Sequence, residues 1–206
     1  MVKQSQFNRI VEFGIPILLL WMFFQFYNFG KVTPSEMIKT TGLLAISLLG
    51  ITLLIGPLSR ILPGLNFLKA FRKTWGILSF VAAFMHTLLV YTYFFKFNFL
   101  RFIDTSNPKY GGILSGLLAL IILLLVTLTS NQKAIDKLSP RIWKIIQTTS
   151  YLALILAVLH FYLMEQADGA LVIRRLLGQI TYVAAILVII LRLLILFLPS
   201  KKEASH

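Results

Sequence analysis

Residues 75–95 read WGILSFVAAFMHTLLVYTYFF, an apolar stretch that carries no formal charge and has one histidine, His86, near its middle. As an α-helix, this stretch would rise about 30 Å, which is the thickness of the hydrocarbon core of a bilayer. Inside lipid the backbone can bond only to itself, so a single spanning segment must be helical. The stretch therefore predicts a transmembrane helix.

Five more stretches of similar length and character precede and follow this one. The chain has 206 residues, of which 58% are hydrophobic and only 13% are charged, against about 25% charged in ordinary soluble domains. Short connections predict antiparallel neighbours in one bundle. We predict an all-α polytopic membrane protein in which residues 1–206 form one domain of six transmembrane helices, without an internal repeat. The expected spans are roughly Ile10–Phe29, Met37–Leu58, Trp75–Phe95, Gly111–Ser130, Trp143–Met164 and Ala170–Ile190.

The net charge of +13 comes from basic residues that lie mostly in the short loops between these spans. Such a distribution is typical of residues that set topology and meet anionic lipid, and it argues against a nucleic-acid partner. Thirteen of the 20 Lys and Arg residues fall on the side that holds both termini. The positive-inside rule then predicts cytoplasmic termini for a multi-pass protein of the inner or plasma membrane.

Two histidines, His86 and His160, lie inside predicted spans, whereas His206 is the last residue and is expected to be solvated. With cytoplasmic termini, both belong to the outer half of the membrane at similar depth. An ionisable side chain in a span is costly and usually functional, and histidine is a common ligand of haem iron. An inter-helix hydrogen bond is the alternative for either one. The chain has no cysteine, which excludes disulfides, thiolate ligands and Cys-ligated iron–sulfur clusters.

Several short motifs occur in an order that resembles a known family. They are Thr41-Gly42-Leu43-Leu44-Ala45, Gly56-Pro57-Leu58-Ser59-Arg60, Phe84-Met85-His86, Arg141-Ile142-Trp143-Lys144 and Leu159-His160-Phe161. Their order and spacing resemble the ferric-reductase-like transmembrane domain. The similarity is greatest to its bacterial haem-binding branch, the membrane partner of a periplasmic methionine sulfoxide reductase. The resemblance covers nearly the whole chain.

This resemblance implies b-type haem held between the third and fifth spans, with His86 and His160 as the outer pair of ligands. It also implies an inner site, where the family's arginine falls on Arg72 and a family histidine is replaced by Gln147. We therefore expect one haem, at the outer site, with the inner haem absent or bound differently. Arg72 and Gln147 could instead hydrogen-bond a quinone or flavin head group. Alternatively, Arg72 is a basic residue that sets the membrane topology, and Gln147 is a polar residue at the membrane interface.

The resemblance implies electron transfer across the membrane to a periplasmic or extracellular acceptor protein, by an electron-transfer subunit rather than a self-contained enzyme. No Gly-rich phosphate loop follows the last span, so we expect a quinol or a separate flavin reductase as donor. Direct reduction of ferric ions or oxygen at the outer face, and a non-redox scaffold or channel, remain alternatives. Candidate partners for haem propionates or an acidic protein are Lys96, Arg101, Arg174 and Arg175.

Overall fold

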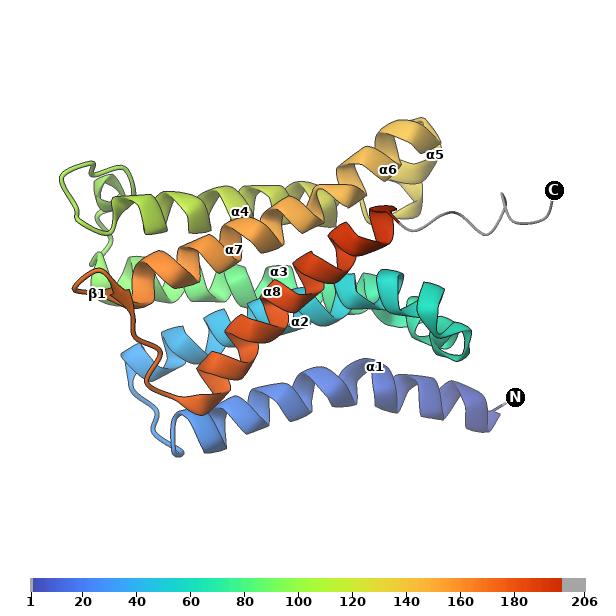
Figure 1. Cartoon of the computed structure of the whole chain (residues 1–206), viewed down its shortest axis with the longest axis horizontal. Coiled ribbons are helices and arrows are strands. Elements are labelled where there is room, and N and C mark those ends of the chain that lie inside the picture. The colour runs from blue at the N-terminus through green and yellow to red at the C-terminus, as the bar shows by residue number, and fades with distance from the viewer. Residues whose placement is uncertain (1, 198–206) are drawn as a thin grey trace.

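The computed structural model describes the backbone of residues 2–197, and the side chains of residues 6–195 and 197. His206 lies outside the described residues. Six long helices lie side by side and form an elongated bundle (Figure 1). All six spans are long and apolar enough to cross a membrane, so the predicted all-α polytopic fold is confirmed. The helices are α1 (Val2–Met22), α2 (Pro34–Ile61), α3 (Arg72–Leu89), α4 (Tyr110–Leu128), α7 (Ser150–Glu165) and α8 (Leu176–Phe197).

Short elements connect these helices at the two ends of the bundle. At the end where α1 begins lie a 3-10 helix (Pro63–Phe71), α5 (Gln132–Lys137) and α6 (Pro140–Thr148). At the opposite end, π-helical turns extend α1 (Phe23–Tyr27) and α3 (Val90–Phe94), and a 3-10 helix (Phe99–Phe102) precedes α4. The end of α8 at Phe197 lies at the same end of the bundle as the start of α1 (Figure 1).

The last span begins later than the sequence predicts. Ala170 was expected to open it, but Ala170–Leu171 form strand β2, which pairs antiparallel with β1 (Gln166–Ala167). Asp168 and Gly169 connect the strands with φ values of 50° and 80°. Such an Asp-Gly pair favours a tight hairpin, because both residues tolerate positive φ. α8 therefore starts only at Leu176.

The fifth span is divided into α6 and α7 at Thr149. Three consecutive hydroxyl side chains bond back to helix carbonyls here: Thr148 to Lys144, Thr149 to Ile146 and Ser150 to Gln147. Such back-bonding competes with the regular backbone ladder and bends helices. The bend moves α6 away from the line of α7 (Figure 1).

The bundle core consists of two antiparallel helix pairs, α2 with α3 and α4 with α7. Ser79 of α3 is fully buried and donates a 2.8 Å hydrogen bond to the carbonyl oxygen of Ala45 in α2. Trp75, which is 1% exposed, donates from its indole N–H to the carbonyl oxygen of Glu12 at 2.8 Å and fixes α1 against α3. α8 crosses the bundle and packs mainly on α2.

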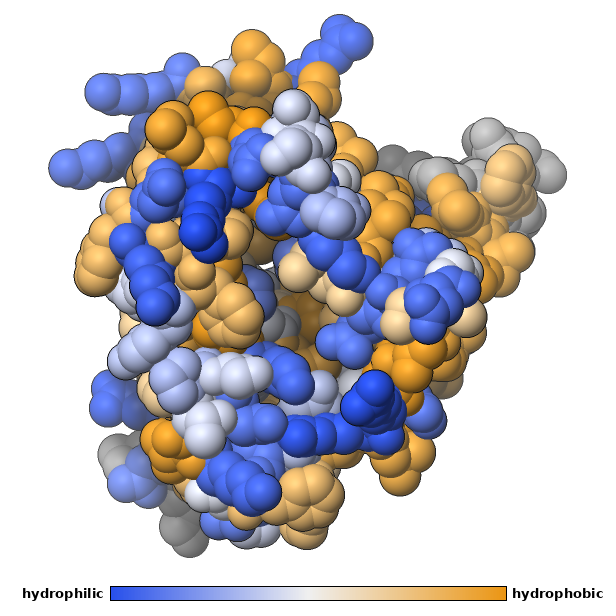
Figure 2. All heavy atoms as spheres, turned by 90° about the vertical axis from the view of Figure 1, so that its left-hand side faces the viewer, coloured by the Kyte–Doolittle hydropathy of each residue, from blue (hydrophilic) through white to orange (hydrophobic). Residues whose placement is uncertain are grey.

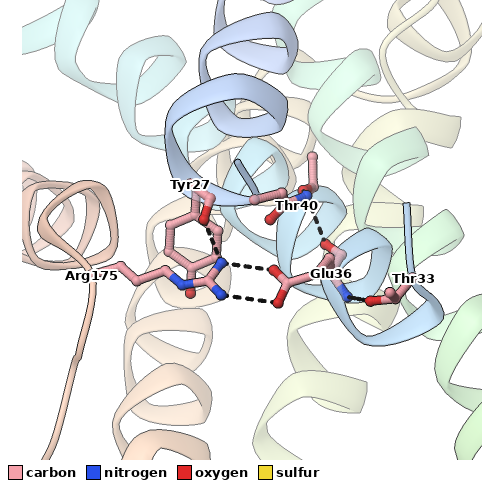
Figure 3. Close-up of polar contacts among 6 residues, drawn as sticks. Tyr27, Thr33, Glu36, Thr40 and Arg175 are labelled. Carbon is pink, nitrogen blue, oxygen red and sulfur yellow. Dashed lines mark hydrogen bonds and ion pairs between the residues drawn. The ribbon is translucent and has the colours of Figure 1, made fainter. Parts of the chain in front are cut away.

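One ion pair joins three helices at the end opposite the start of α1 (Figure 3). The Arg175 guanidinium donates to both carboxylate oxygens of Glu36, at 2.7 and 2.9 Å, and also to the carbonyl oxygen of Tyr27. The same guanidinium lies 4.6 Å from the centroid of the Tyr27 ring. Thr33 caps α2 by accepting the Glu36 backbone N–H, so the carboxylate is held where Arg175 reaches it. This contact ties together the end of α1, the start of α2 and the start of α8.

We expect Glu36→Gln to destabilise the bundle, because it leaves the guanidinium of Arg175 without its bidentate partner. Loss of one charge-assisted hydrogen bond from such a partly exposed pair costs about 1 kcal/mol, so the thermal midpoint in detergent should fall by a few degrees. The control is Arg174→Gln, since Arg174 is exposed and forms no ion pair with the described residues. Equal midpoints for the two variants would show that the ion pair does not stabilise the fold.

Candidate functional site

The structure brings the two predicted histidines together. His86 lies on α3 and His160 on α7, and their imidazole centroids are 5.9 Å apart with ring planes at 85° to each other. Both rings line one cavity of about 450 Å³ between α2, α3, α4 and α7. Two imidazoles bound through Nε2 to one metal, each by a bond of about 2 Å, have centroids roughly 6 Å apart. The observed separation therefore fits two ligands of a single metal ion.

A backbone carbonyl fixes each ring. The Nδ1 of His86 lies 2.8 Å from the carbonyl oxygen of Ile38, and the Nδ1 of His160 lies 2.8 Å from that of Gly112. A carbonyl can only accept, so each Nδ1 must carry a hydrogen. In a neutral imidazole the lone pair is then on Nε2, which is the form that ligates a metal. Metal-binding histidines commonly donate their second N–H to a carbonyl in this way.

Two glycines make room for these rings. A Cβ atom on Gly42 would lie 3.0 Å from Nδ1 of His86, and one on Gly116 would lie 2.7 Å from Nδ1 of His160. Each glycine precedes its histidine by 44 residues, and each accepting carbonyl precedes it by 48. The α2–α3 pair and the α4–α7 pair thus build the same contact at positions 74 residues apart. The equal glycine–histidine spacing in the sequence could have signalled this repeated contact.

The cavity is largely apolar, and its polar residues lie toward the end of the bundle that carries the β-hairpin. Its wall includes Ala83, Ala119 and Ala157, small side chains that leave space beside the imidazoles. Figure 2 looks onto that end and shows a hollow near its centre, with hydrophilic residues around it. Besides the two histidines, the polar residues of the lining are Ser35, Lys39, Asn107, Lys109 and Glu165, together with Tyr27 and Thr87.

The basic residues on the cavity are not those that the sequence predicted. Lys39 and Lys109 line it, whereas Lys96, Arg101, Arg174 and Arg175 are not among the described lining residues. The guanidinium of Arg175 is instead paired with Glu36. Lys109 donates to the carbonyl oxygens of Leu163 and Gln166, at 2.9 and 2.6 Å, which holds its ammonium group at the end of α7. The sequence could not separate these two lysines from other loop charges, because only the packing of α2 and α4 decides which ones face inward.

Arg72 and Gln147 lie elsewhere, and neither lines the cavity. Arg72 donates its Nε–H to the carbonyl oxygen of Thr52 at 3.2 Å. The amide nitrogen of Gln147 lies within 3.3 Å of three acceptors in and just after α4: the carbonyl oxygen of Val126 and the hydroxyls of Thr129 and Ser130. Gln147 therefore fastens α6 to the end of α4.

Two imidazoles alone are too few ligands for a bare metal ion, since protein zinc sites use at least three. Within the described residues, no group of three or more His, Cys, Asp or Glu side chains could hold a metal. A haem iron needs only axial ligands, because the porphyrin supplies the equatorial nitrogens. The paired neutral imidazoles, their spacing and the apolar cavity fit a group of that kind.

Comparison with known proteins agrees with the resemblance found in the sequence. Residues 41–158 match the family model of the ferric reductase like transmembrane component, a range that includes Arg72, His86 and Gln147 and ends two residues before His160. Similar proteins include the heme-binding subunit MsrQ of protein-methionine-sulfoxide reductase from several bacteria. The Xanthomonas euvesicatoria protein is 33% identical over 74% of this chain and 72% of its own length, and the Salmonella paratyphi B protein is 30% identical over 69% and 72%.

The Brucella anthropi heme-binding subunit MsrQ is 31% identical over 65% of this chain, and the matched region spans 59% of that protein's length. The family match covers more than half of the chain, including all of α3 and α4, most of α2 and the first part of α7. It is accompanied by six helices long and apolar enough to cross a membrane. This multi-pass protein of the cell membrane therefore belongs to the ferric reductase like transmembrane component family.

Proposed function

We propose that this protein is a membrane cytochrome b that binds one haem between His86 and His160 and passes electrons to an acceptor at the outer face. The main support is the pair of imidazoles, 5.9 Å apart, with both Nδ1 atoms engaged by carbonyls and both rings on one cavity. The printed names of the relatives, which are heme-binding subunits, support the same cofactor.

The chain's own residues have distinct roles in this proposal. His86 and His160 offer Nε2 as axial ligands, while Ile38 and Gly112 hold the rings in the required tautomer through Nδ1. Bound haem supplies a centre that accepts and donates one electron. Because His86 and His160 would both ligate the iron, a haem held there would supply one-electron transfer and would be a poor site for direct oxygen reduction.

Lys39 and Lys109 are the proposed partners of the haem propionates. Both line the cavity, and both belong to the helix ends nearest the hairpin end of the bundle, where a carboxylate can reach water. Lys109 is already oriented by two carbonyls. A lysine ammonium at such a site offsets the cost of placing a propionate beside apolar helices.

The proposed acceptor is a periplasmic methionine sulfoxide reductase, and the proposed donor is a quinol or a separate flavin reductase on the cytoplasmic side. The excess of Lys and Arg at the end with both termini supports this orientation. A single haem is proposed because Gln147 stands where the family's second histidine is expected, and its amide nitrogen is already engaged by α4. That engagement also favours a structural role for Gln147 over contact with a quinone or flavin.

Replacement of either cavity histidine tests the haem assignment. Purified wild-type protein should show a low-spin Soret band and a haem-to-protein ratio near one by pyridine haemochrome. His86→Ala and His160→Ala should each lower haem occupancy at least about tenfold or change the spectrum to high-spin, because each removes one axial ligand. His206→Ala is the control and should resemble the wild type. A wild-type ratio near two, or unchanged spectra in both cavity variants, would contradict the proposal.

The glycines give an independent test that leaves the ligands in place. Gly116→Ala puts a methyl group 2.7 Å from Nδ1 of His160, so the ring must move and haem affinity should fall roughly tenfold. Gly50→Ala on α2 is the matched control, since a Cβ there meets nothing within 4 Å. Haem titration of both variants checks this. Equal affinities would mean that the close approach of Gly116 does not position the ligand.

The acceptor can be identified by stopped-flow spectroscopy of the reduced protein. We expect a periplasmic methionine sulfoxide reductase to reoxidise the haem faster than ferric citrate or dissolved oxygen does, because the iron offers no open position to a small molecule. Faster reoxidation by ferric citrate or oxygen would favour a reductase that acts directly at the outer face. Protein without a Soret band after haem-replete expression would instead favour a non-redox scaffold.

A further inference from the structure

Two half-buried arginines flank Tyr151 at the end of the bundle remote from the haem cavity. Arg72 is the first residue of α3, Arg192 lies near the end of α8, and Tyr151 lies near the start of α7. The Arg192 guanidinium carbon is 4.9 Å from the centroid of the Tyr151 ring. A Cβ atom on Gly56 would lie 3.8 Å from Nη1 of Arg72 and 3.7 Å from the Tyr151 hydroxyl. One guanidinium therefore faces the ring, while the other and the Tyr151 hydroxyl both border Gly56.

Neither guanidinium is neutralised by the part of the chain that the structure describes. The one ion pair found there joins Arg175 and Glu36 at the opposite end of the bundle. Arg72 donates only its Nε–H, to the carbonyl oxygen of Thr52, and Arg192 makes no hydrogen bond to a described residue. Tyr151 donates its own hydroxyl hydrogen to the carbonyl oxygen of Leu53 at 2.9 Å. Two positive charges in a partly apolar setting thus have no anionic partner among the described residues.

The cluster lies near the ends of its helices, where the headgroup region of a bilayer is expected. Arg192 lies five residues before the end of α8 at Phe197, so its long side chain can extend along the helix toward the headgroup region. Gly56 lies five residues, or about one and a half helical turns, before the end of α2 at Ile61. Exposed basic residues surround this end, among them Arg60, Lys73 and Lys144.

We propose that Arg72 and Arg192 bind the phosphate group of an anionic phospholipid, with Tyr151 between them. Guanidinium groups bind phosphate oxygens through paired N–H donors, and a lipid phosphate is the anion that a membrane presents at this depth. Four helices contribute to the cluster: Gly56 from α2, Arg72 from α3, Tyr151 from α7 and Arg192 from α8. A lipid bound there would hold the start of α3 and the end of α8 against α7.

The test compares two double variants that lose the same charge at the same end of the bundle. Arg72→Gln/Arg192→Gln removes the proposed site, and Lys73→Gln/Lys144→Gln removes two exposed charges. Native mass spectrometry with added phosphatidylglycerol measures lipid retention. We expect roughly 30-fold weaker retention for the arginine pair and little change for the lysine pair. Arg192→Gln alone, which breaks no hydrogen bond to a described residue, should weaken retention roughly fivefold.

Three results would overturn the proposal. Equal lipid retention in the two double variants would show that the two arginines attract lipid no more strongly than exposed lysines do. Thermal stabilisation of the wild type by inorganic phosphate, without stabilisation by phosphatidylglycerol at the same phosphate concentration, would assign the site to a soluble phosphate. Loss of haem from the arginine variant, with lipid retention unchanged, would assign the cluster to a haem propionate. Lipid loss with normal haem content supports the lipid site whether or not the proposed electron acceptor is correct.

Discussion

The hydrogen bond from each cavity histidine to a helix carbonyl is the contact on which the rest of the site depends. A buried imidazole needs a partner for its N–H, and in a membrane bundle the nearest acceptors are carbonyls of the neighbouring helix. Ile38 and Gly112 provide them at 2.8 Å. This contact positions the ring and selects its tautomer, and it requires the close helix approach that Gly42 and Gly116 allow. The same hydrogen bond therefore depends on close helix packing and leaves the lone pair of each ring on Nε2.

The same contact occurs twice, 74 residues apart, and this explains how two single histidines come to face each other. In each antiparallel pair, α2–α3 and α4–α7, the histidine lies on the second helix. A backbone carbonyl of the first helix accepts the hydrogen bond from its ring. The cavity lies between these two similar halves. A planar cofactor with two axial positions suits a site whose two walls are built alike. α1 and α8 have no counterpart in this arrangement, and the Arg175–Glu36 pair fastens them at one end.

Sequence alone predicted the six spans and both cavity histidines, because apolar length and the cost of an imidazole in lipid are local properties. It did not predict the division of the fifth span at Thr149 or the hairpin at Ala170, since hydroxyl back-bonding and an Asp-Gly turn interrupt apolar runs without changing their hydropathy. It also missed Lys39 and Lys109. Which loop lysines face a cavity depends on helix rotation, which hydropathy does not record.

Both ends of the bundle carry basic side chains that the carboxylates of the chain cannot all neutralise. The sequence has 20 Lys and Arg residues but only seven Asp and Glu, so carboxylates of the chain can pair with a minority of its cations. Exposed cations meet water, but half-buried ones in a membrane bundle need another anion. Lys39 and Lys109 at the cavity of the two histidines, and Arg72 and Arg192 around Tyr151, are in this position. Propionates at one end and a lipid phosphate at the other would supply the anionic partners that these side chains do not find among the described residues.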